Sequence, residues 1–481
     1  MRPRIILSAL SYILIAVGLS MIIPLSWALY YGDGSWMVFI KSMSITMATG
    51  LLIYFIFPIQ AERVKYIEGY LIVTLAWLSM VIFGTLPYLF SGTMTFTDAF
   101  FETMSGFTTT GATILIDIEA LPEGILMWRS LTQWLGGMGI IVLFVALISQ
   151  FGVGANKIFG AEAPGPVIEK LTPKISDTAK NLWKFYMLFT FAQIILLFIA
   201  GMTFYDSMAH TFSTIATGGF STKNIGIGYY LDSQIIQLII TLFMFLGGTN
   251  FALYYLFWKN KSFKVFVKNE EFRLYFIIIA LATILVAFSL YAANTVELEI
   301  LPITALFQVV SILTTTGYAT VDYDLWPSMA RNVMFLLLFI GGSIGSTAGG
   351  LKIGRLLILF KITLEELTKF IHPRAILNLK INGKAVDNKI ATNTLVFFFV
   401  YLTIVALGTL VMSSFNLDLQ TSLTAVLASL GVIGPGLAGV GPAMNYSEIP
   451  ETGKYFLSAL MLLGRLELFT ILLLFYPKSW K

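Results

Sequence analysis

Four short segments of the chain each carry a glycine in a setting suited to holding a bare cation. A ring of backbone carbonyl oxygens can replace the water shell of an ion. Glycine reaches the positive φ values that let successive carbonyls point the same way, and threonine beside it can supply hydroxyl oxygens. We therefore interpret each segment as one quarter of a cation filter. The segments are TTTGAT at 108–113, ATGGFS at 216–221, TTTGYAT at 314–320 and GVIGPG at 431–436.

Taken singly, each segment could equally be a glycine-bearing turn or a close contact between membrane helices, where small residues are common. Four copies at the same phase of a repeating pattern favour the filter. The fourth copy, 431–436, lacks threonine and holds Pro435 between two glycines. A ring built from one chain need not be symmetric, so we retain this copy in the prediction.

Each segment follows an apolar stretch of about 10–14 residues, which is too short to cross a hydrocarbon core about 30 Å thick. We expect these stretches to be re-entrant half-helices. Such a helix would point its C-terminal end at the filter, where the partial negative charge of its dipole favours a cation. The stretches lie at roughly 96–107, 206–215, 303–313 and 417–430.

Two polar residues within these stretches have more modest interpretations. Glu102, in the first half-helix, either bonds the filter backbone or helps to wet a vestibule. His210, in the second, is interpreted as a satisfied polar residue rather than as a ligand.

The composition predicts a polytopic membrane protein. Hydrophobic residues make up 57% of the 481 residues and charged residues only 12%, about half the roughly 25% usual for soluble domains. Ten longer apolar stretches are candidate crossings. They lie at roughly 5–30, 36–58, 68–91, 125–151, 183–205, 233–258, 274–293, 332–360, 390–414 and 452–477.

The third to tenth crossings parse as four repeats of span, half-helix, glycine segment and span. The key glycines recur about every 100–120 residues, as in an internal repeat. We therefore predict an all-α polytopic membrane protein, with two N-terminal helices plus four helix–pore-helix–filter–helix repeats around one pore. The expected divisions are 1–60 for the two introductory helices, then 61–152, 153–260 (with a cytoplasmic connector), 261–372 (with a broken second helix) and 373–481 for the repeats.

The basic residues indicate the orientation of the chain. If the N-terminus is cytoplasmic, most of the 30 Lys and Arg residues fall in inner segments, as cytoplasmic loops require. An even number of crossings then makes both termini cytoplasmic. The first apolar stretch follows Arg2 and Arg4 as a signal peptide would, but it is too long and no small-residue cleavage site follows it.

The segment 341–350, GGSIGSTAGG, interrupts the eighth crossing with five glycines in ten residues. Each glycine weakens a helix by about 1 kcal/mol relative to alanine, so a regular helix is disfavoured here. The segment is either a mobile intramembrane loop that blocks or clears a pore, or a tightly packed contact between helices.

Arg465 lies near the middle of the last crossing. A charge there costs about 2.5–3.5 kcal/mol on insertion scales, so it should face the bundle interior or the pore. It acts either as a positive charge below the filter that slows or meters cations, or as one half of a structural ion pair. Glu467, two residues on, does not share its helix face.

Other classes of protein fit the sequence less well. There are no cysteines and only two histidines, which excludes disulfides and speaks against a histidine-rich metal site. An integral-membrane enzyme, such as a lipid-modifying transferase, is the alternative of a different class. It would need a wet cluster of His, Asp or Glu, and these residues are scattered. A secondary carrier would usually show inverted repeats.

The chain resembles the Trk/Ktr/HKT family of potassium transporters, and within it the bacterial TrkH type, over essentially all 481 residues. The four glycine segments carry this resemblance, together with WLGGMGIIVL at 134–143, GGSIGSTAGGLKIGR at 341–355 and GRLELFT at 464–470. The resemblance implies potassium uptake across the bacterial cytoplasmic (inner) membrane, with potassium as the transported ion. It also implies a homodimer, surrounded by membrane lipid, with a cytosolic nucleotide-binding ring protein of the TrkA type as regulator.

The resemblance also assigns residues. The loop of 341–350 and Arg465 are the implied gate, with Gly345, Ser346 and Gly349 in the loop. In plant relatives that pass sodium the first filter position can be serine. Gly111 here favours potassium, and a sodium or mixed-cation member of the same family is the alternative. The implied filter positions are Thr110, Gly111, Thr217, Gly218, Thr316, Gly317, Ile433 and Gly434.

Overall fold

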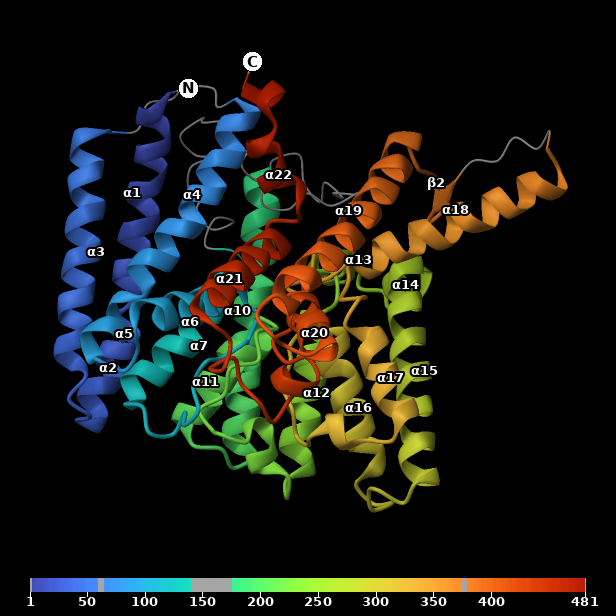
Figure 1. Ribbon diagram of the computed structural model, residues 1–481, viewed down its shortest axis with the longest axis horizontal. Helices are drawn as coiled ribbons and strands as arrows, with labels where there is room; N and C mark the ends of the chain where they lie inside the picture. The colour runs from blue at the N-terminus through green and yellow to red at the C-terminus, as the bar shows by residue number, and fades with distance from the viewer. Residues whose placement is uncertain (1, 59–64, 138, 140–174, 374–378, 481) are drawn as a thin grey trace.

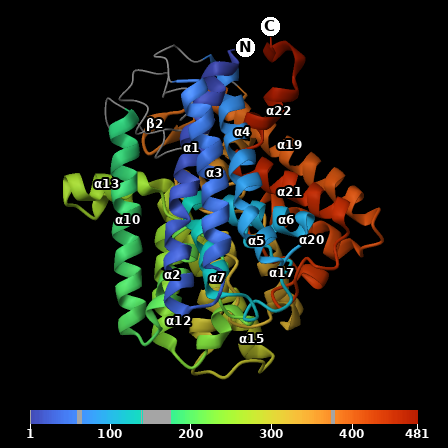
Figure 2. The ribbon, with the colours of Figure 1, turned by 90° about the vertical axis from the view of Figure 1, so that its left-hand side faces the viewer.

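The computed structural model describes residues 2–58, 65–137, 139, 175–373 and 379–480, and these are mostly helical (Figure 1). Among them, the strands are the two-residue pair β1 (Lys380–Ile381) and β2 (Lys384–Ala385), which form a small antiparallel hairpin. The two ends of the chain lie at the same end of the molecule (Figures 1 and 2). The all-α prediction is confirmed.

Six helical stretches in the described residues are long and apolar enough to cross a membrane, or up to eight if each bent pair is one span. The straight candidates are Pro3–Tyr31 (α1, Pro3–Ser20, with α2, Ile22–Tyr31), Trp36–Ile56 (α3), Tyr66–Ser91 (α4, Tyr66–Gly84, with α5, Leu86–Ser91), Ala179–Ile199 in α10 (Ile175–Ile199), Glu270–Ala292 (α15) and Asn388–Ser413 (α19).

Two predicted crossings are broken in the middle. The stretch 233–258 forms α12 (Gln234–Gly247) and α13 (Phe251–Asn260), which meet at 90°, and 452–477 forms α21 (Glu451–Arg465) and α22 (Phe469–Phe475), which meet at 114°. Both stretches were predicted as crossings from their unbroken hydropathy, and each is one crossing if its bent pair counts as one span. The second break has Glu467 and Leu468 at positive φ, 55° and 43°.

The two remaining predicted crossings are described in part or are interrupted. In 125–151, α7 (Glu123–Gly137) is described, and the residues from 140 onward lie outside the described part. In 332–360, α17 (Ser328–Leu337) is followed by an irregular segment, and a new helix, α18 (Ile353–Ile371), begins after it. This irregular segment lies where the third repeat was predicted to have a broken second helix. The expected division near 61 and the connector up to residue 174 lie outside the described residues.

The four half-helices are present within two residues of their predicted bounds. Two of them begin at a threonine cap: Thr95 Oγ1 accepts from the Asp98 amide (3.3 Å), and Thr203 Oγ1 accepts from the Asp206 amide (3.0 Å). Such caps satisfy amides that have no partner inside the helix. The half-helices are α6 (Phe96–Thr108), α11 (Phe204–Ile215), α16 (Leu301–Leu313) and α20 (Leu419–Leu430).

The repeats follow one another around the molecule. The introductory helices α1 and α3 stand side by side in Figures 1 and 2, at one edge of the molecule in Figure 1. The half-helices are closely packed by the rest of the protein. After the first turn, nearly every residue of α6, α11, α16 and α20 is buried. The interior of the molecule is therefore built around the ends of these four short helices.

Candidate functional site

The four glycine segments share one backbone conformation. In each, a residue in the left-handed region follows the half-helix, and a glycine of positive φ stands two positions later. Non-glycine residues rarely hold positive φ unless their surroundings impose it, so the repetition marks a built feature. The pairs and their φ values are Thr109 (61°) and Gly111 (82°), Thr217 (53°) and Gly219 (79°), Thr315 (56°) and Gly317 (76°), and Val432 (58°) and Gly434 (97°).

One hydrogen bond recurs where each half-helix ends. The amide between the two positive-φ residues donates back to a carbonyl near the end of the half-helix, which turns the chain sharply away from the helix axis. The four bonds are Thr110 to Ser105 O (2.8 Å), Gly218 to Ser213 O (2.8 Å), Thr316 to Ser311 O (2.9 Å) and Ile433 to Ala428 O (2.9 Å).

The four segments meet in a closed ring. Each positive-φ glycine lies against a carbonyl oxygen of the next repeat, and the fourth returns to the first. A side chain at any of these glycines would collide with that oxygen, which explains the residue type. From an ideal Cβ to the oxygen, the distances are 2.1 Å from Gly111 to Gly218 O, 2.0 Å from Gly219 to Thr316 O, 2.0 Å from Gly317 to Ile433 O and 2.6 Å from Gly434 to Thr110 O.

The second repeat differs from the prediction by one residue. Thr217 and Gly218 were the predicted filter pair, but the φ values and hydrogen bonds make Gly218 and Gly219 the equivalents of Thr110 and Gly111. Two adjacent glycines occur here, and sequence alone does not tell which of them takes the positive φ. The other predicted pairs fall at equivalent positions, and the structure brings all four segments together.

The threonine hydroxyls in the ring have partners within the protein. Thr110 and Thr316 share hydrogen bonds of 2.8 Å with Thr108 and Thr314, the threonines two positions earlier. These pairs occur in the first and third repeats, which face each other across the ring. These hydroxyl pairs therefore brace the first and third segments of the ring from within their own repeats.

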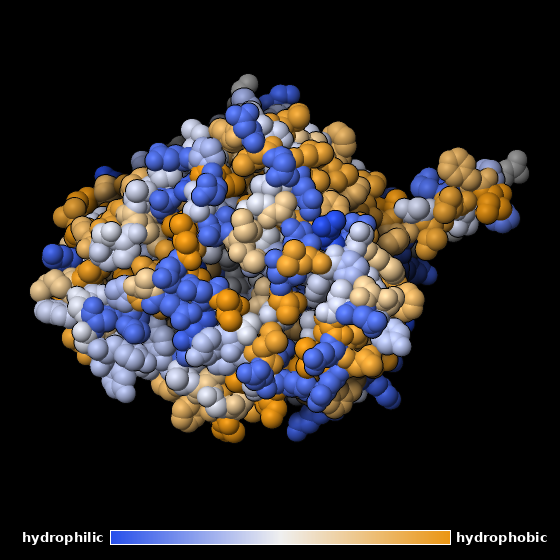
Figure 3. Space-filling model, turned by 60° about the horizontal axis from the view of Figure 1, so that its bottom comes forward, coloured by the Kyte–Doolittle hydropathy of each residue, from blue (hydrophilic) through white to orange (hydrophobic). Residues whose placement is uncertain are grey.

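A cavity of about 500 Å³ opens beyond the ring, and Gly111, Gly219, Gly317 and Gly434 all line it. It faces away from the end of the molecule that holds the two chain termini. Figure 3 shows hydrophilic residues gathered around a central hollow on this face. The ring is thus the floor of this open vestibule.

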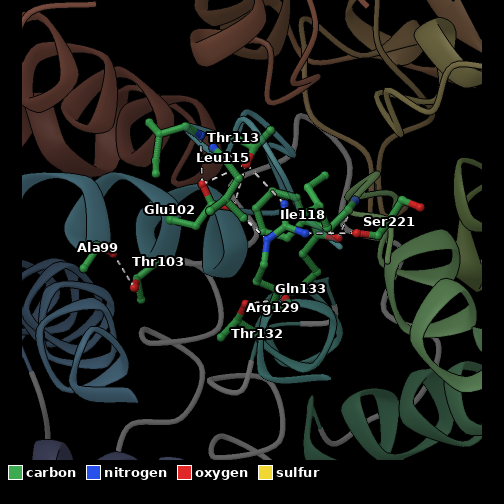
Figure 4. Close-up of polar contacts among 12 residues, drawn as sticks. Ala99, Glu102, Thr103, Thr113, Leu115, Ile118, Arg129, Thr132, Gln133 and Ser221 are labelled. Carbon is green, nitrogen blue, oxygen red and sulfur yellow. Dashed lines mark hydrogen bonds and ion pairs between the residues drawn. The ribbon is translucent and has the colours of Figure 1, made fainter. Parts of the chain in front are cut away.

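A buried ion pair supports the chain as it leaves the filter (Figure 4). Arg129 of α7 and Glu102 of α6 are 1% and 0% exposed, and Arg129 Nε lies 2.8 Å from Glu102 Oε1. Glu102 also accepts from the Ile114 amide (3.0 Å), and Arg129 Nη1 donates to Ser221 O (3.0 Å). The pair therefore joins the first repeat to the second. Glu102 therefore bonds the backbone just beyond the first glycine segment.

The same place in the next two half-helices is also polar. His210 Nε2 lies 3.0 Å from Ser221 Oγ, and Gln308 Nε2 donates to Val321 O (3.1 Å). Glu102, His210 and Gln308 thus each bond the chain beyond their own filter glycine. His210 is a satisfied polar residue, as predicted. Arg129 was not predicted as a site residue; its signal was a charge inside an apolar helix.

The irregular segment between α17 and α18 lies directly beneath the ring. Its Thr347 Oγ1 donates to Ile215 O (3.1 Å) and lies within 3.2 Å of Thr217 Oγ1. The Gly349 amide donates to Thr315 Oγ1 (2.8 Å). Of the predicted gate residues, Gly349 lies against the ring, whereas Gly345 O accepts from the Phe251 amide and Ser346 bonds within its own segment.

Arg465 connects this segment to the filter. Its guanidinium donates to Thr109 Oγ1 (3.1 Å), to Thr347 O (2.9 Å), to Gly137 O (2.7 Å) and to Gly136 O. Glu467 instead pairs with Lys352 (3.1 Å) and with Arg355. The Arg465 guanidinium thus lies among carbonyl and hydroxyl oxygens beneath the ring, with its Cζ 5.8 Å from the centroid of the Trp77 ring.

A repeated motif shows why Arg465 is unusual. The helices that follow the filters carry WLGG, FLGG, FIGG and LLGR at 134–137, 245–248, 339–342 and 462–465. Arg465 therefore stands where the other repeats have Gly137, Gly248 and Gly342. Only the fourth repeat places a charge at this position.

Comparison with known proteins agrees with this arrangement. The profile of the TrkH family, described as a cation transport protein, matches residues 35–481. The chain is 38% identical over 489 residues to the Trk system potassium uptake protein TrkH of Escherichia coli K12, and 37% identical over 484 residues to the protein of that name from Halomonas elongata. Both alignments cover 100% of each chain.

A solved structure matches over the same extent. The crystal structure of the potassium transporter TrkH from Vibrio parahaemolyticus superposes with a TM-score of 0.91 at 34% identity, covering 100% of both chains. These relatives are named as transport proteins, and this chain is likewise a transporter rather than an enzyme. With its apolar helices and its four repeats, the chain belongs to the TrkH family of membrane cation transport proteins.

Proposed function

We propose that this protein takes up potassium ions through the ring formed by the four glycine segments. The observation that carries the proposal is the closed circuit of glycine–carbonyl contacts, because it sets peptide oxygens from four repeats around one point. Carbonyl rings of this kind replace the hydration shell of an ion. The proposed filter residues are Thr110, Gly111, Gly218, Gly219, Thr316, Gly317, Ile433 and Gly434, with Thr217 just beneath them.

The surroundings of the ring suit a cation. Four half-helices point their C-terminal ends at it, and each contributes partial negative charge there. In the described residues, no group of three or more His, Asp or Glu could hold a metal ion, so the oxygens on offer are those of the backbone and of threonine. The relatives that match the whole chain are named for potassium uptake.

The segment beneath the ring is proposed to be the gate, with Arg465 as its latch. The loop touches the ends of the second, third and fourth half-helices, and Arg465 reaches the first. An ion leaving the ring would meet this loop and the guanidinium together. Withdrawal of Gly349 and Thr347 from beneath the ring would clear its path.

The setting of the protein is also part of the proposal. We place it in the bacterial cytoplasmic membrane with both termini in the cytoplasm and the vestibule outside. We further propose a homodimer that works with a cytosolic nucleotide-binding ring protein of the TrkA type, because the relatives are named as members of a Trk system. Mass measurement of the purified protein, alone and mixed with that ring protein, tests both partners.

Ion flux tests the central claim. The purified protein is reconstituted into liposomes, and uptake of labelled rubidium is measured with potassium, rubidium or sodium as competitors. Uptake that potassium and rubidium suppress, and sodium does not, is the expected result. Equal suppression by sodium identifies the protein as a mixed-cation member of the family. No uptake by folded protein, with the gate segment deleted as well as intact, contradicts the proposal.

A further inference from the structure

Gln133 holds the second filter segment from behind. It lies in α7 of the first repeat, one turn from Arg129 (Figure 4), and is 0% exposed. Its Nε2 donates to Gly218 O (2.7 Å), and its Oε1 accepts from the Phe220 amide (3.0 Å). Both polar ends of one side chain therefore grip the backbone on either side of Gly219.

The other repeats have no such grip. Counted from the motif that ends in Gly136–Gly137, the positions equivalent to Gln133 are Met244, Leu338 and Met461. These are buried apolar residues, between 0% and 2% exposed. Their side chains have no amide group that could donate a hydrogen bond. Burial of the glutamine side-chain amide costs free energy unless the amide is hydrogen-bonded. A glutamine at this apolar position therefore indicates a specific role for its hydrogen bonds.

Gly218 matches Gln133 in shape. Its equivalents in the ring are Thr110, Thr316 and Ile433, which all carry side chains. Glycine is not required here by the backbone, since Gly218 is not among the residues of positive φ. It is required by space, because a Cβ on Gly218 would lie 2.5 Å from Cδ of Gln133. The two residues are a complementary pair.

The gripped oxygen belongs to the ring itself. Gly218 O is the atom against which Gly111 packs, so the position of this carbonyl depends on the Gln133 amide. A donated hydrogen bond also draws electron density from that oxygen, which weakens its attraction for a cation. Position and field strength of the ring oxygens are the quantities on which discrimination between potassium and sodium depends.

We propose that Gln133 is a positioning residue that sets ion selectivity by fixing the Gly218 carbonyl in the ring. The proposal rests on the proposed function, namely potassium passage through this ring. In this proposal the second segment is held by the side chain of Gln133, which belongs to another repeat. The first and third segments are instead held by threonine pairs of their own.

The first test replaces Gln133 with methionine, the residue found in two other repeats. We expect the ratio of potassium to sodium uptake in liposomes to fall by roughly fivefold, which corresponds to the net free energy of one ordinary hydrogen bond. Potassium should still pass. Gln133→Glu provides a second variant, which keeps the shape but removes the donor to Gly218 O. It should shift the ratio in the same direction.

A matched control is available in α10. Gln193 is also 0% exposed, and in the described part of the structure its amide makes no hydrogen bond. Gln193→Met should leave the ratio unchanged. A folded Gln133→Met or Gln133→Glu protein with wild-type selectivity overturns the inference. Folded wild-type protein that takes up neither potassium nor rubidium overturns the proposed function instead, so the two failures are distinguishable.

A double-mutant cycle checks the pairing directly. Gly218→Ala alone pushes a methyl group against the Gln133 amide and should disturb potassium uptake. Combined with Gln133→Met, whose flexible chain can move aside, the same alanine should cost less than in the wild-type background. Strict additivity of the two effects would show that the residues act independently and would contradict the pairing.

Discussion

Replacement of Gly317 by alanine tests the ring most directly. Gly317 has a φ of 76°, and an ideal Cβ there lies 2.0 Å from Ile433 O. Two costs follow. Holding alanine in the left-handed region costs roughly 1–2 kcal/mol. The oxygen must also retreat by roughly 1.4 Å, from 2.0 Å to the 3.4 Å at which ordinary contact begins.

A second glycine separates these two costs. Gly92, at the end of α5, has a φ of 69° but no atom within 4 Å of its Cβ. Gly92→Ala therefore introduces backbone strain but no steric collision. Gly92→Ala should lose thermal stability without losing transport, whereas Gly317→Ala should lose at least as much stability and should also lose transport. Displacement by about 1 Å in a preorganised site costs on the order of 100-fold, so we expect rubidium uptake to fall between roughly 10-fold and 100-fold.

The effect should be graded around the ring. Gly434 has 2.6 Å between its ideal Cβ and Thr110 O, so Gly434→Ala moves its oxygen less than Gly317→Ala does. Uptake into liposomes and melting temperature are measured on the same preparations. The reasoning is refuted if Gly317→Ala protein melts like Gly92→Ala protein and transports equally well, because the Ile433 carbonyl would then lie outside the path of the ion.

Three further predictions concern the gate and its support. Deletion of 343–349 should raise rubidium flux, since these residues lie beneath the ring; unchanged or lower flux in a folded protein would reject the gate. Arg465→Gly, which introduces the glycine found at this position in the other repeats, should also raise rubidium flux because it removes the positive charge. A folded variant with unchanged flux would contradict the role of Arg465 as a latch. Glu102→Gln leaves Arg129 buried without its carboxylate and should destabilise the protein by about 3–5 kcal/mol, measured as a lower melting temperature; a melting temperature equal to that of wild type would show that the ion pair contributes little.

Local patterns in the sequence predicted the half-helices, and three of the four proposed filter pairs fall at equivalent positions in the ring. A short apolar stretch before a threonine–glycine step is visible within a window of about 20 residues, and α6 at Phe96–Thr108 matches the predicted 96–107. The register of Gly218 and Gly219 was not predictable, because either glycine can take a positive φ. The structure decides between them through the contact of Gly219 with Thr316 O, from another repeat.

Long-range partners were beyond the reach of the sequence. Arg129 and Gln133 act on Ser221 and Gly218, which lie far along the chain, and no periodicity marks such a contact. The bends after Gly247 and Arg465 were missed for a related reason. Hydropathy continues across them, and the second bend accompanies the pairing of Glu467 with Lys352 and Arg355, which only the folded molecule brings near.

Arg465 takes the place of the second glycine in the motif that the other three repeats carry as WLGG, FLGG and FIGG. This substitution illustrates an advantage of having four repeats in one polypeptide. An assembly of four identical subunits would carry this residue four times and crowd four guanidinium groups at the same level, where like charges repel strongly in a medium of low dielectric constant. Fusion of the repeats lets one copy diverge while Gly137, Gly248 and Gly342 keep room for close packing. A lone charge close to the central axis is thus an option that a symmetric tetramer does not have.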